Sequence, residues 1–237
     1  MSNNNCGASV GEADEIEDEE RFWSDEMKAV MDGEPVLENS RGLKKNEVRT
    51  LSEEKDDFEG QLLGAGGDYL SQFDIDPQIE DADLVVVEDA EDVAHIDTDL
   101  DLTESAAYIH DEEEVLVFTR TQRGSYSGFD PVGSIAHELK HRGQELRYEG
   151  TVMDNHPVTE ASTQLLNMYR EGILENNRKA DRRIESLRGS NYPDPEALAE
   201  ETKLAAESYN NLLENDVGRE EAMAFMLNEY EERRIDE

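Results

Sequence analysis

The chain has 237 residues, of which 60 are Asp or Glu and 22 are Lys or Arg, so its formal net charge is −38. This balance lacks the basic surface that nucleic-acid binding requires, and it excludes direct binding to a duplex. A single cysteine, Cys6, excludes an internal disulfide and a cysteine-rich zinc site.

The acidic residues are spread along the whole chain and alternate with periodic apolar residues. This pattern favours a folded protein adapted to high salt, where screening limits self-repulsion to a few ångströms, over a disordered acidic protein. No apolar run approaches the length of a membrane span, and the first residues lack the features of a secretory signal. We therefore expect no membrane partner and a cytoplasmic location, or a virion location if the protein is viral.

The first part of the chain is expected to lie outside the main domain. Residues 1–20 are polar and acidic and are predicted to form a disordered tail. Residues 21–78 read as an N-terminal helical arm and linker, with a short amphipathic helix up to Met31, a linker from Gly33 to Gly42 and a weak helix. The sequence Gly64 to Gly67 is predicted to end that helix.

Residues 79–237 are expected to form one domain in which strands precede helices. The predicted strands span residues 83–88, 106–110 and 114–119, the last two forming a hairpin. Asp130 is a suitable N-cap and Pro131 a suitable first residue for a helix that continues to about residue 146. Further helices are predicted from Pro157, over 195–215 and over 218–235. The order predicts an α+β fold, with a small antiparallel or mixed sheet packed on this first helix and a helical C-terminal part.

The helix that follows Asp130 carries the segment His137-Glu138-Leu139-Lys140-His141. Residues four apart project from the same helical face, so the two imidazoles can occupy two corners of a tetrahedral zinc site. Glu138 is turned about 100 degrees round the helix, where it can reach a water on the metal instead of the metal itself. Zinc lowers the pKa of such a water to about 7, and a carboxylate can then act as general base.

The segment from Gly133 to His141 resembles the zincin metallopeptidases, over roughly residues 84–180. The resemblance implies a zinc-dependent peptidase that acts on a peptide or protein substrate. It also implies a sheet whose edge strand binds the substrate, and Val115 and Val117 are the candidates for that strand.

In the branch of zincins with a glutamate ligand, the third ligand comes from the next helix, about twenty residues on. Glu160 lies 19 residues after His141 and near the start of the helix that follows Pro157. Asp154 and His156 are the alternatives for this ligand. The branch with a third histidine is disfavoured, because Gln144 and Arg147 occupy its diagnostic positions.

The sequence points to no single residue that orients the histidines and to no single donor that stabilises the oxyanion. Larger glutamate zincins often place a carboxylate shortly after the third ligand, where this chain has Thr163 and Gln164. They also use a Tyr or His for the oxyanion, for which the candidates here are Tyr148, Tyr169, Tyr192 and Tyr209. The arrangement is also similar to the minimal glutamate zincins and to regulatory zincin-like peptidases encoded beside phage repressors.

Two other functions compete with the peptidase. One is a zincin-fold regulatory or structural protein, viral or cellular, that binds a partner without turnover. The other is a helical protein without a metal, in which the two histidines are spaced by chance. The sequence indicates no substrate specificity and no oligomeric state.

Overall fold

The computed structural model describes residues 23–77, 79, 82–96, 105–109, 113–119, 129–147, 157–190 and 192–235 of the chain. The helices are α2 (Asp25–Met31), α3 (Val36–Asn39), the 3-10 helix η2 (Ser40–Gly42), α4 (Lys45–Glu54), α5 (Phe58–Ser71), α6 (Pro131–Arg147), α7 (Pro157–Arg170), α8 (Asn177–Leu187), α9 (Pro195–Glu214), α10 (Arg219–Phe225), the π-helix η5 (Met226–Tyr230) and α11 (Glu231–Ile235). The strands are β1 (Asp83–Val87), β2 (Ala106–Ile109) and β3 (Glu114–Phe118). The tail predicted for residues 1–20 lies outside the described residues.

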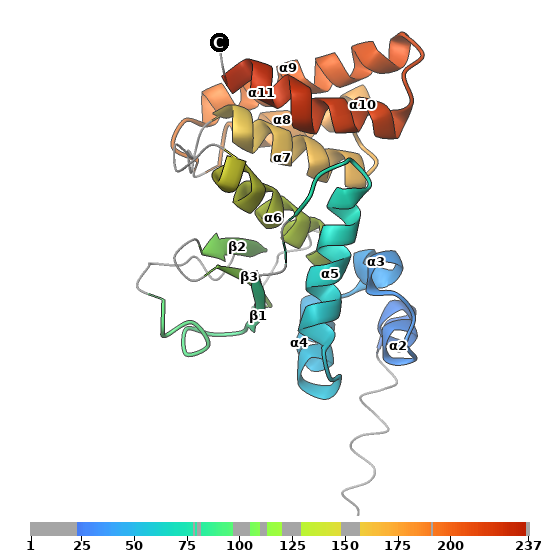
Figure 1. Cartoon of the computed structure of the whole chain (residues 1–237), viewed down its shortest axis with the longest axis vertical. Helices are drawn as coiled ribbons and strands as arrows, with labels where there is room; N and C mark the ends of the chain where they lie inside the picture. Colours follow the sequence, from blue (N-terminus) through green and yellow to red (C-terminus); the bar gives the residue numbers. More distant parts are fainter. Residues whose placement is uncertain are drawn as a thin grey trace, which may run out of the picture.

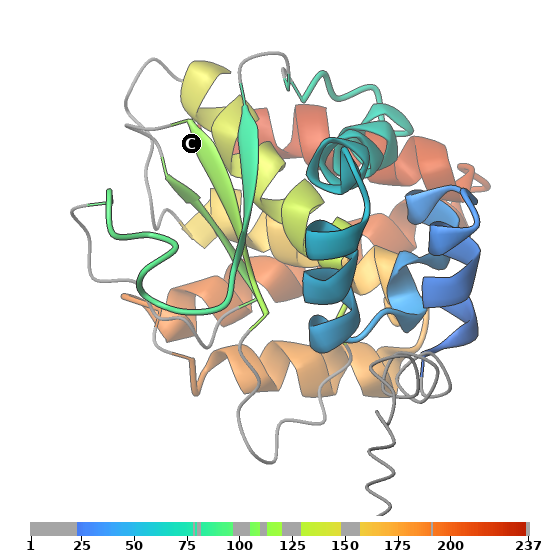
Figure 2. The ribbon, with the colours of Figure 1, turned by 90° about the horizontal axis from the view of Figure 1, so that it is seen from below.

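The fold is α+β, as predicted, and consists mainly of helices with one small mixed sheet. Helix α6 lies between the sheet and α7, and α7 in turn packs against α9 (Figure 1). Viewed from below, the strands run along one side of the body, α2 and α3 lie on the opposite side, and α4 lies between them (Figure 2). Among the described residues, no helix combines the length and the apolar character that crossing a membrane would demand.

The strand order in the sheet is β1-β3-β2, with β1 parallel and β2 antiparallel to β3. The predicted hairpin of β2 and β3 is therefore confirmed. Alternate residues of β3 face opposite sides: Val115 and Val117 join the main core, whereas Leu116 and Phe118 join a smaller apolar cluster. Each face of the strand is thus covered.

The prediction that Val115 and Val117 belong to the substrate-binding edge strand is wrong. Both side chains are fully buried, and β3 is the central strand, paired on both sides. The apolar character of a strand indicates that it is buried, but it does not show whether the strand lies at the centre or at the edge of its sheet. The edges within the described sheet are β1 and β2.

Helix α6 begins where the sequence predicts. The Asp130 carboxylate accepts a hydrogen bond from the backbone N–H of Gly133 at 3.0 Å, and Pro131 is the first helical residue. Asp130 is held in turn by Arg170 of α7, whose guanidinium donates to both of its oxygens at 2.6 and 3.0 Å. The helix start and the end of α7 are therefore tied together.

The N-terminal helices belong to the same core as α6. One cluster of buried apolar side chains contains Met27 and Leu51 as well as Ile135 and Leu166. The division at residue 78 into an arm and a domain therefore has no counterpart in the packing. The linker predicted from Gly33 to Gly42 is also partly helical, because α3 and η2 lie within it. It packs against the body, since Ser40 is fully buried.

The glycines expected to end a helix lie inside α5 instead, so this prediction is wrong. A Cβ on Gly66 would lie 2.5 Å from Cγ2 of Ile135, so the missing side chain lets α5 approach α6 closely. Interhelical packing outweighs the poor helix propensity of glycine here, which is about 1 kcal/mol per residue. Gly64, in contrast, has no atom within 4 Å of its potential Cβ.

These two glycines provide a matched test of the α5–α6 contact. We expect Gly64→Ala to stabilise the protein by up to about 1 kcal/mol, because alanine favours the helix. Gly66→Ala should instead be destabilising, because overpacking costs about 1–3 kcal/mol and exceeds the same helical gain. Denaturant unfolding of the two variants measures the difference, and equal stabilisation by both would show that the helices do not touch at Gly66.

Candidate metal centre

Two histidines project from one face of α6, as the sequence predicts. His137 and His141 lie one turn apart, and their ring centroids are 4.8 Å from each other. Their Nε2 atoms approach to 3.1 Å. Both side chains are mostly buried, with 13% of His137 and 24% of His141 exposed.

Glu160 reaches the two rings from the first turn of α7. Its Oε2 lies 3.0 Å from Nε2 of His141, and its Oε1 lies 3.6 Å from Nε2 of His137. A carboxylate is favoured in the first turn of a helix by the helix dipole. Of the described His, Cys, Asp and Glu residues, these three form the group whose potential ligand atoms converge, all within 4.8 Å of one another.

The three side chains lie close to the spacing of a zinc site. Two ligands of a tetrahedral zinc ion, each about 2.0 to 2.1 Å from the metal, lie about 3.3 Å apart. The two Nε2 atoms are 3.1 Å apart, and the carboxylate turns a different oxygen to each ring, at 3.0 Å from His141 and 3.6 Å from His137. With one ligand atom per residue, the atoms lie within 4.8 Å of one another, so a single ion would need a small rotation of the carboxylate. Two imidazoles and one carboxylate are also the ligand set of catalytic zinc sites that leave one position open. The residues present therefore fit a zinc ion.

The short distances between Glu160 and the two histidines also shift the pKa values of all three side chains when no metal is bound. Burial lowers the pKa of His137 to about 4, although Glu160 acts in the opposite direction. Burial alone would lower the pKa of His141 too, but the hydrogen bond and charge of Glu160 raise it above its ordinary value. Burial would raise the pKa of Glu160, but the two histidines lower it to about 2. Near neutral pH, Glu160 is therefore ionised and His137 is neutral.

Each histidine has an amide side chain on its other ring nitrogen. Nδ1 of His141 donates to Oε1 of Gln144 at 2.9 Å, which leaves Nε2 facing the cluster. Nδ1 of His137 accepts from the amide nitrogen of Asn167 on α7 at 3.1 Å, which places the proton of the neutral ring on Nε2. Metal binding by this Nε2 requires the Asn167 amide to turn and present its oxygen to Nδ1. Partners of this kind set the tautomer and orientation of metal-binding histidines. Gln144 and Asn167 thus take the supporting role for which the sequence offered no carboxylate.

Gln144 is itself held by a buried polar cluster that includes the last helix. Its Nε2 donates to Glu231 of α11 at 2.7 Å, and Lys140 donates to the same oxygen, also at 2.7 Å. Ser162 of α7 donates to Glu231 as well. Both Lys140 and Glu231 are almost fully buried. The C-terminal helix therefore supports the residue that orients His141.

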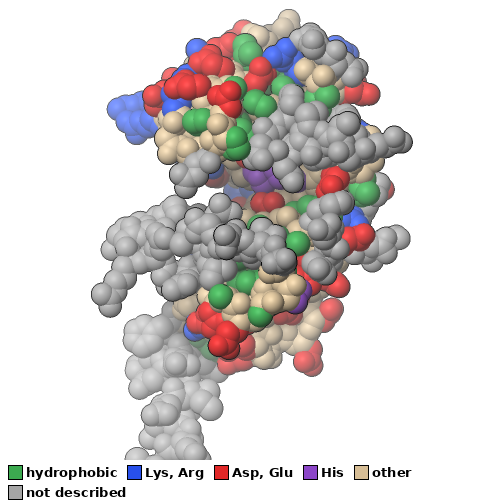
Figure 3. Space-filling model, turned by 90° about the vertical axis from the view of Figure 1, so that its left-hand side faces the viewer, with side chains coloured by type: hydrophobic (Ala, Val, Ile, Leu, Met, Phe, Trp, Pro, Cys, Tyr) green, Lys and Arg blue, Asp and Glu red, His purple; other side chains and the backbone are tan. Residues whose placement is uncertain are grey.

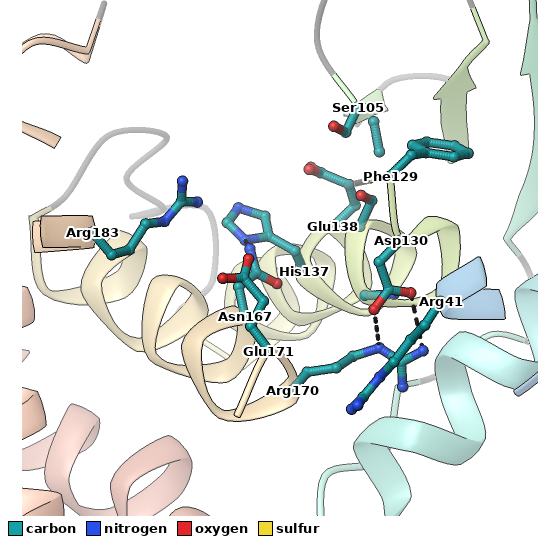
Figure 4. A pocket seen from close by; sticks show the side chains of 13 residues that line it. Arg41, Ser105, Phe129, Asp130, His137, Glu138, Asn167, Arg170, Glu171 and Arg183 are labelled. Atoms are coloured by element: carbon teal, nitrogen blue, oxygen red, sulfur yellow. Dashed lines mark hydrogen bonds and ion pairs between the residues drawn. The ribbon is translucent and has the colours of Figure 1, made fainter. Parts of the chain in front are cut away.

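A cavity of about 700 Å³ opens beside the cluster and is lined by His137 and Glu138. In the close view, both side chains come from α6 at the middle of the cavity wall, and Ser105 lies close to Glu138 (Figure 4). On the face shown in Figure 3, histidine side chains reach the surface within a hollow, with acidic and basic side chains beside them. The charge of Glu138 also acts on His141. Glu138 is thus adjacent to the cluster without belonging to it, as predicted.

The structure tests only some of the alternative metal ligands and oxyanion tyrosines that the sequence predicts. Asp154, His156 and Tyr148 lie outside the described residues. Tyr169 and Tyr209 pack edge to face in the core, and their ring centroids are 6.2 Å apart. Tyr192 remains as a candidate near the cluster, because burial and the charge of Glu160 both raise its pKa and its buried hydroxyl has no hydrogen-bond partner among the described residues.

Sequence reasoning missed the polar residues that surround the cluster, although their spacing carried a signal. On α6, residues 137, 141 and 144 lie on one helical face, and on α7 residues 160, 164 and 167 do the same. Both helices carry further polar residues, so this spacing marks a shared polar interface only in combination with the packing of α6 on α7. The chain shows no match to a known protein-family model, to a curated protein or to a solved structure.

The pKa values of the cluster predict how zinc binding depends on pH. Because the pKa of His141 is raised above 6.5, this ring is protonated at pH 6, and zinc has to displace that proton. His137, with a pKa of about 4, is already neutral at this pH. We expect about one proton to be released per zinc bound at pH 6, and the affinity for zinc to rise from pH 6 to pH 8.

Calorimetric titration with zinc in buffers of different ionisation enthalpy measures this proton release. Glu160→Gln in the absence of zinc provides the control, because it removes the carboxylate that raises the pKa of His141 and should lower that pKa in an NMR titration. Release of two protons per zinc would show that both histidines are charged and that the inferred protonation is wrong.

Proposed function

We propose that this chain is a zinc-dependent peptidase that hydrolyses peptide bonds with Glu138 as general base. The observation that carries the proposal is the convergence of potential ligand atoms of His137, His141 and Glu160 within 4.8 Å of one another, beside a cavity that His137 and Glu138 line. The resemblance of the 133–141 segment to zincin metallopeptidases supports the same conclusion. The geometry of the site is therefore the main evidence for the activity.

The proposed chemistry assigns a role to each residue. The three ligands would hold a zinc ion, which supplies Lewis acidity that lowers the pKa of a water to about 7 and polarises the peptide carbonyl. Glu138 accepts the proton of the attacking water and delivers it to the amine that leaves. Gln144 and Asn167 keep the two imidazoles oriented. Tyr192 is the candidate donor to the oxyanion.

The strand proposed to bind the substrate is β2, an edge strand of the sheet, in place of the central strand β3. Phe118 of β3 donates a backbone hydrogen bond to Ser105, so the next residue, Ala106, and Tyr108 direct their backbone groups away from β3. Among the described strands, none pairs with that side of β2. Ser105 and Ala106 also line the cavity with Glu138. A peptide that added to β2 as a further strand would therefore pass in front of the general base.

A pair of isosteric substitutions tests the proposal. Glu138→Gln should retain zinc but lower the rate of cleavage by at least about a hundredfold, because the base is removed and the ligands remain. Glu160→Gln should weaken zinc binding itself, because a ligand charge is lost. Zinc per chain is measured by elemental analysis, and cleavage of casein is measured in molar salt with and without a chelator.

The outcomes separate the candidate functions. Equal cleavage by Glu138→Gln and the wild type would refute the mechanism. Zinc bound at one ion per chain without cleavage of casein or peptides would indicate a protein that uses the site for binding alone. Absence of zinc from the wild type, even after incubation with the metal, would show that the spacing of the histidines is accidental.

A further inference from the structure

The cavity beside the candidate metal centre is less acidic than the rest of the protein. Asp and Glu outnumber Lys and Arg by 60 to 22 in the chain, but the cavity lining holds three of each sign. The basic residues are Arg41, Arg170 and Arg183. Arg170 is occupied by Asp130, which accepts two of its hydrogen bonds, and by Ser40. Within the described ranges, no acidic side chain forms an ion pair with Arg41 or Arg183, so their charges can balance a ligand.

Arg183 comes from a basic segment of the chain. Residues 177–188, which include all of α8, carry five Lys or Arg and two Asp or Glu, against the opposite balance in the whole chain. The apolar side chains of α8 are buried against the body, and Arg183 is directed to the cavity (Figure 4). A local excess of positive charge therefore lies at one end of the cavity, next to His137.

The guanidinium of Arg183 uses only some of its N–H donors in hydrogen bonds to the described residues. It donates to Oε1 of Gln164 at 3.2 Å, while its buried Nε has no hydrogen-bond partner among the described residues. Buried donors without a partner are rare in proteins, so this guanidinium is incompletely satisfied by the described residues. The planar fork of an arginine matches the two oxygens of a carboxylate.

Gln164 keeps this arginine from pairing with the metal ligand. Its Nε2 donates to Oε1 of Glu160 at 2.8 Å, and its Oε1 accepts from Arg183. The neutral amide thus separates two opposite charges that would otherwise form an ion pair. Glu160 remains available to a metal, and Arg183 remains available to an anion. The charge of Arg183 still acts on His137, so an anion held there would lie close to the reacting centre.

We propose that Arg183 binds a carboxylate of the substrate, so that the peptidase selects peptides with an acidic group next to the cleaved bond. The inference rests on the proposed peptidase function, and it specifies the substrate class of the same site. The carboxylate has two possible sources, an Asp or Glu side chain and the C-terminal carboxylate of a peptide. Both present the same planar pair of oxygens to the guanidinium.

Peptide binding tests the inference without relying on turnover. The zinc-loaded Glu138→Gln protein is titrated into octapeptides with a central Glu-Glu, Gln-Gln or Lys-Lys pair, each with a free or an amidated C-terminus and a neutral fluorophore. We expect carboxylate-bearing peptides to bind about tenfold more tightly than their neutral counterparts. Adding Arg183→Gln should remove this preference. Adding Arg182→Gln, which makes the same charge change at an exposed neighbour, should leave it unchanged.

The two sources give different patterns. Preference for Glu-Glu over Gln-Gln in amidated peptides supports side-chain recognition, and preference for free over amidated Gln-Gln peptides supports recognition of the C-terminus. Equal binding of all these peptides, or equal effects of Arg183→Gln and Arg182→Gln, would overturn the inference. The titration is repeated in 1 M salt, because attraction by the general field of α8 is screened there and a direct contact is less affected.

Failure of the inference is distinguishable from failure of the peptidase function. Cleavage of casein that depends on zinc and Glu138, without any carboxylate preference, would remove Arg183 from substrate recognition and leave the peptidase in place. Carboxylate binding that depends on Arg183, without any cleavage by the wild type, would leave the anion site and remove the peptidase. Equal thermal unfolding of Arg183→Gln and Arg182→Gln confirms that the comparison concerns binding.

Discussion

The candidate site depends on one contact, the approach of the polar face of α6 to the polar face of α7. This contact places the carboxylate of Glu160 within 3.0 Å of one imidazole and 3.6 Å of the other. A charged carboxylate buried to this degree is stable only where opposite charges or hydrogen bonds compensate its lost hydration. Here His141, whose pKa Glu160 raises, and Gln164 do so, and a divalent cation would do so more fully.

The helices behind the site keep this contact at the required distance. Gly66 allows α5 to pack closely on the opposite side of α6, and Arg170 joins the end of α7 to Asp130 at the start of α6. Glu231 joins α11 to both helices through Lys140 and Ser162. Because each of these interactions is buried or partly buried, a shift of either helix would leave polar groups without partners. The orientation of the two histidines is therefore coupled to helices far away in the sequence.

The distribution of charge separates the site from the remaining surface. A chain with a net charge of −38 repels anionic ligands at long range, unless salt screens the field. The basic helix α8 and the arginines of the cavity create an exception beside the candidate metal centre. Gln164 is central to this arrangement, because it bonds to Glu160 and to Arg183 and so holds opposite charges apart. Specificity and metal binding can then use separate side chains of one small region.

The sequence by itself determined whatever depends on distances within one element. The shared face of His137 and His141, the Asp130 cap and the hairpin of β2 and β3 follow from the repeat of a helix or the alternation of a strand. The resemblance to zincins points to Glu160, with Asp154 and His156 as alternatives, but only the tertiary structure shows that its carboxylate meets the two histidines, since this depends on how two helices cross. The tertiary structure also decided that β3 is central, that α5 continues through its glycines, and that Arg183 reaches the cavity. These features arise from packing between elements, which local periodicity does not encode.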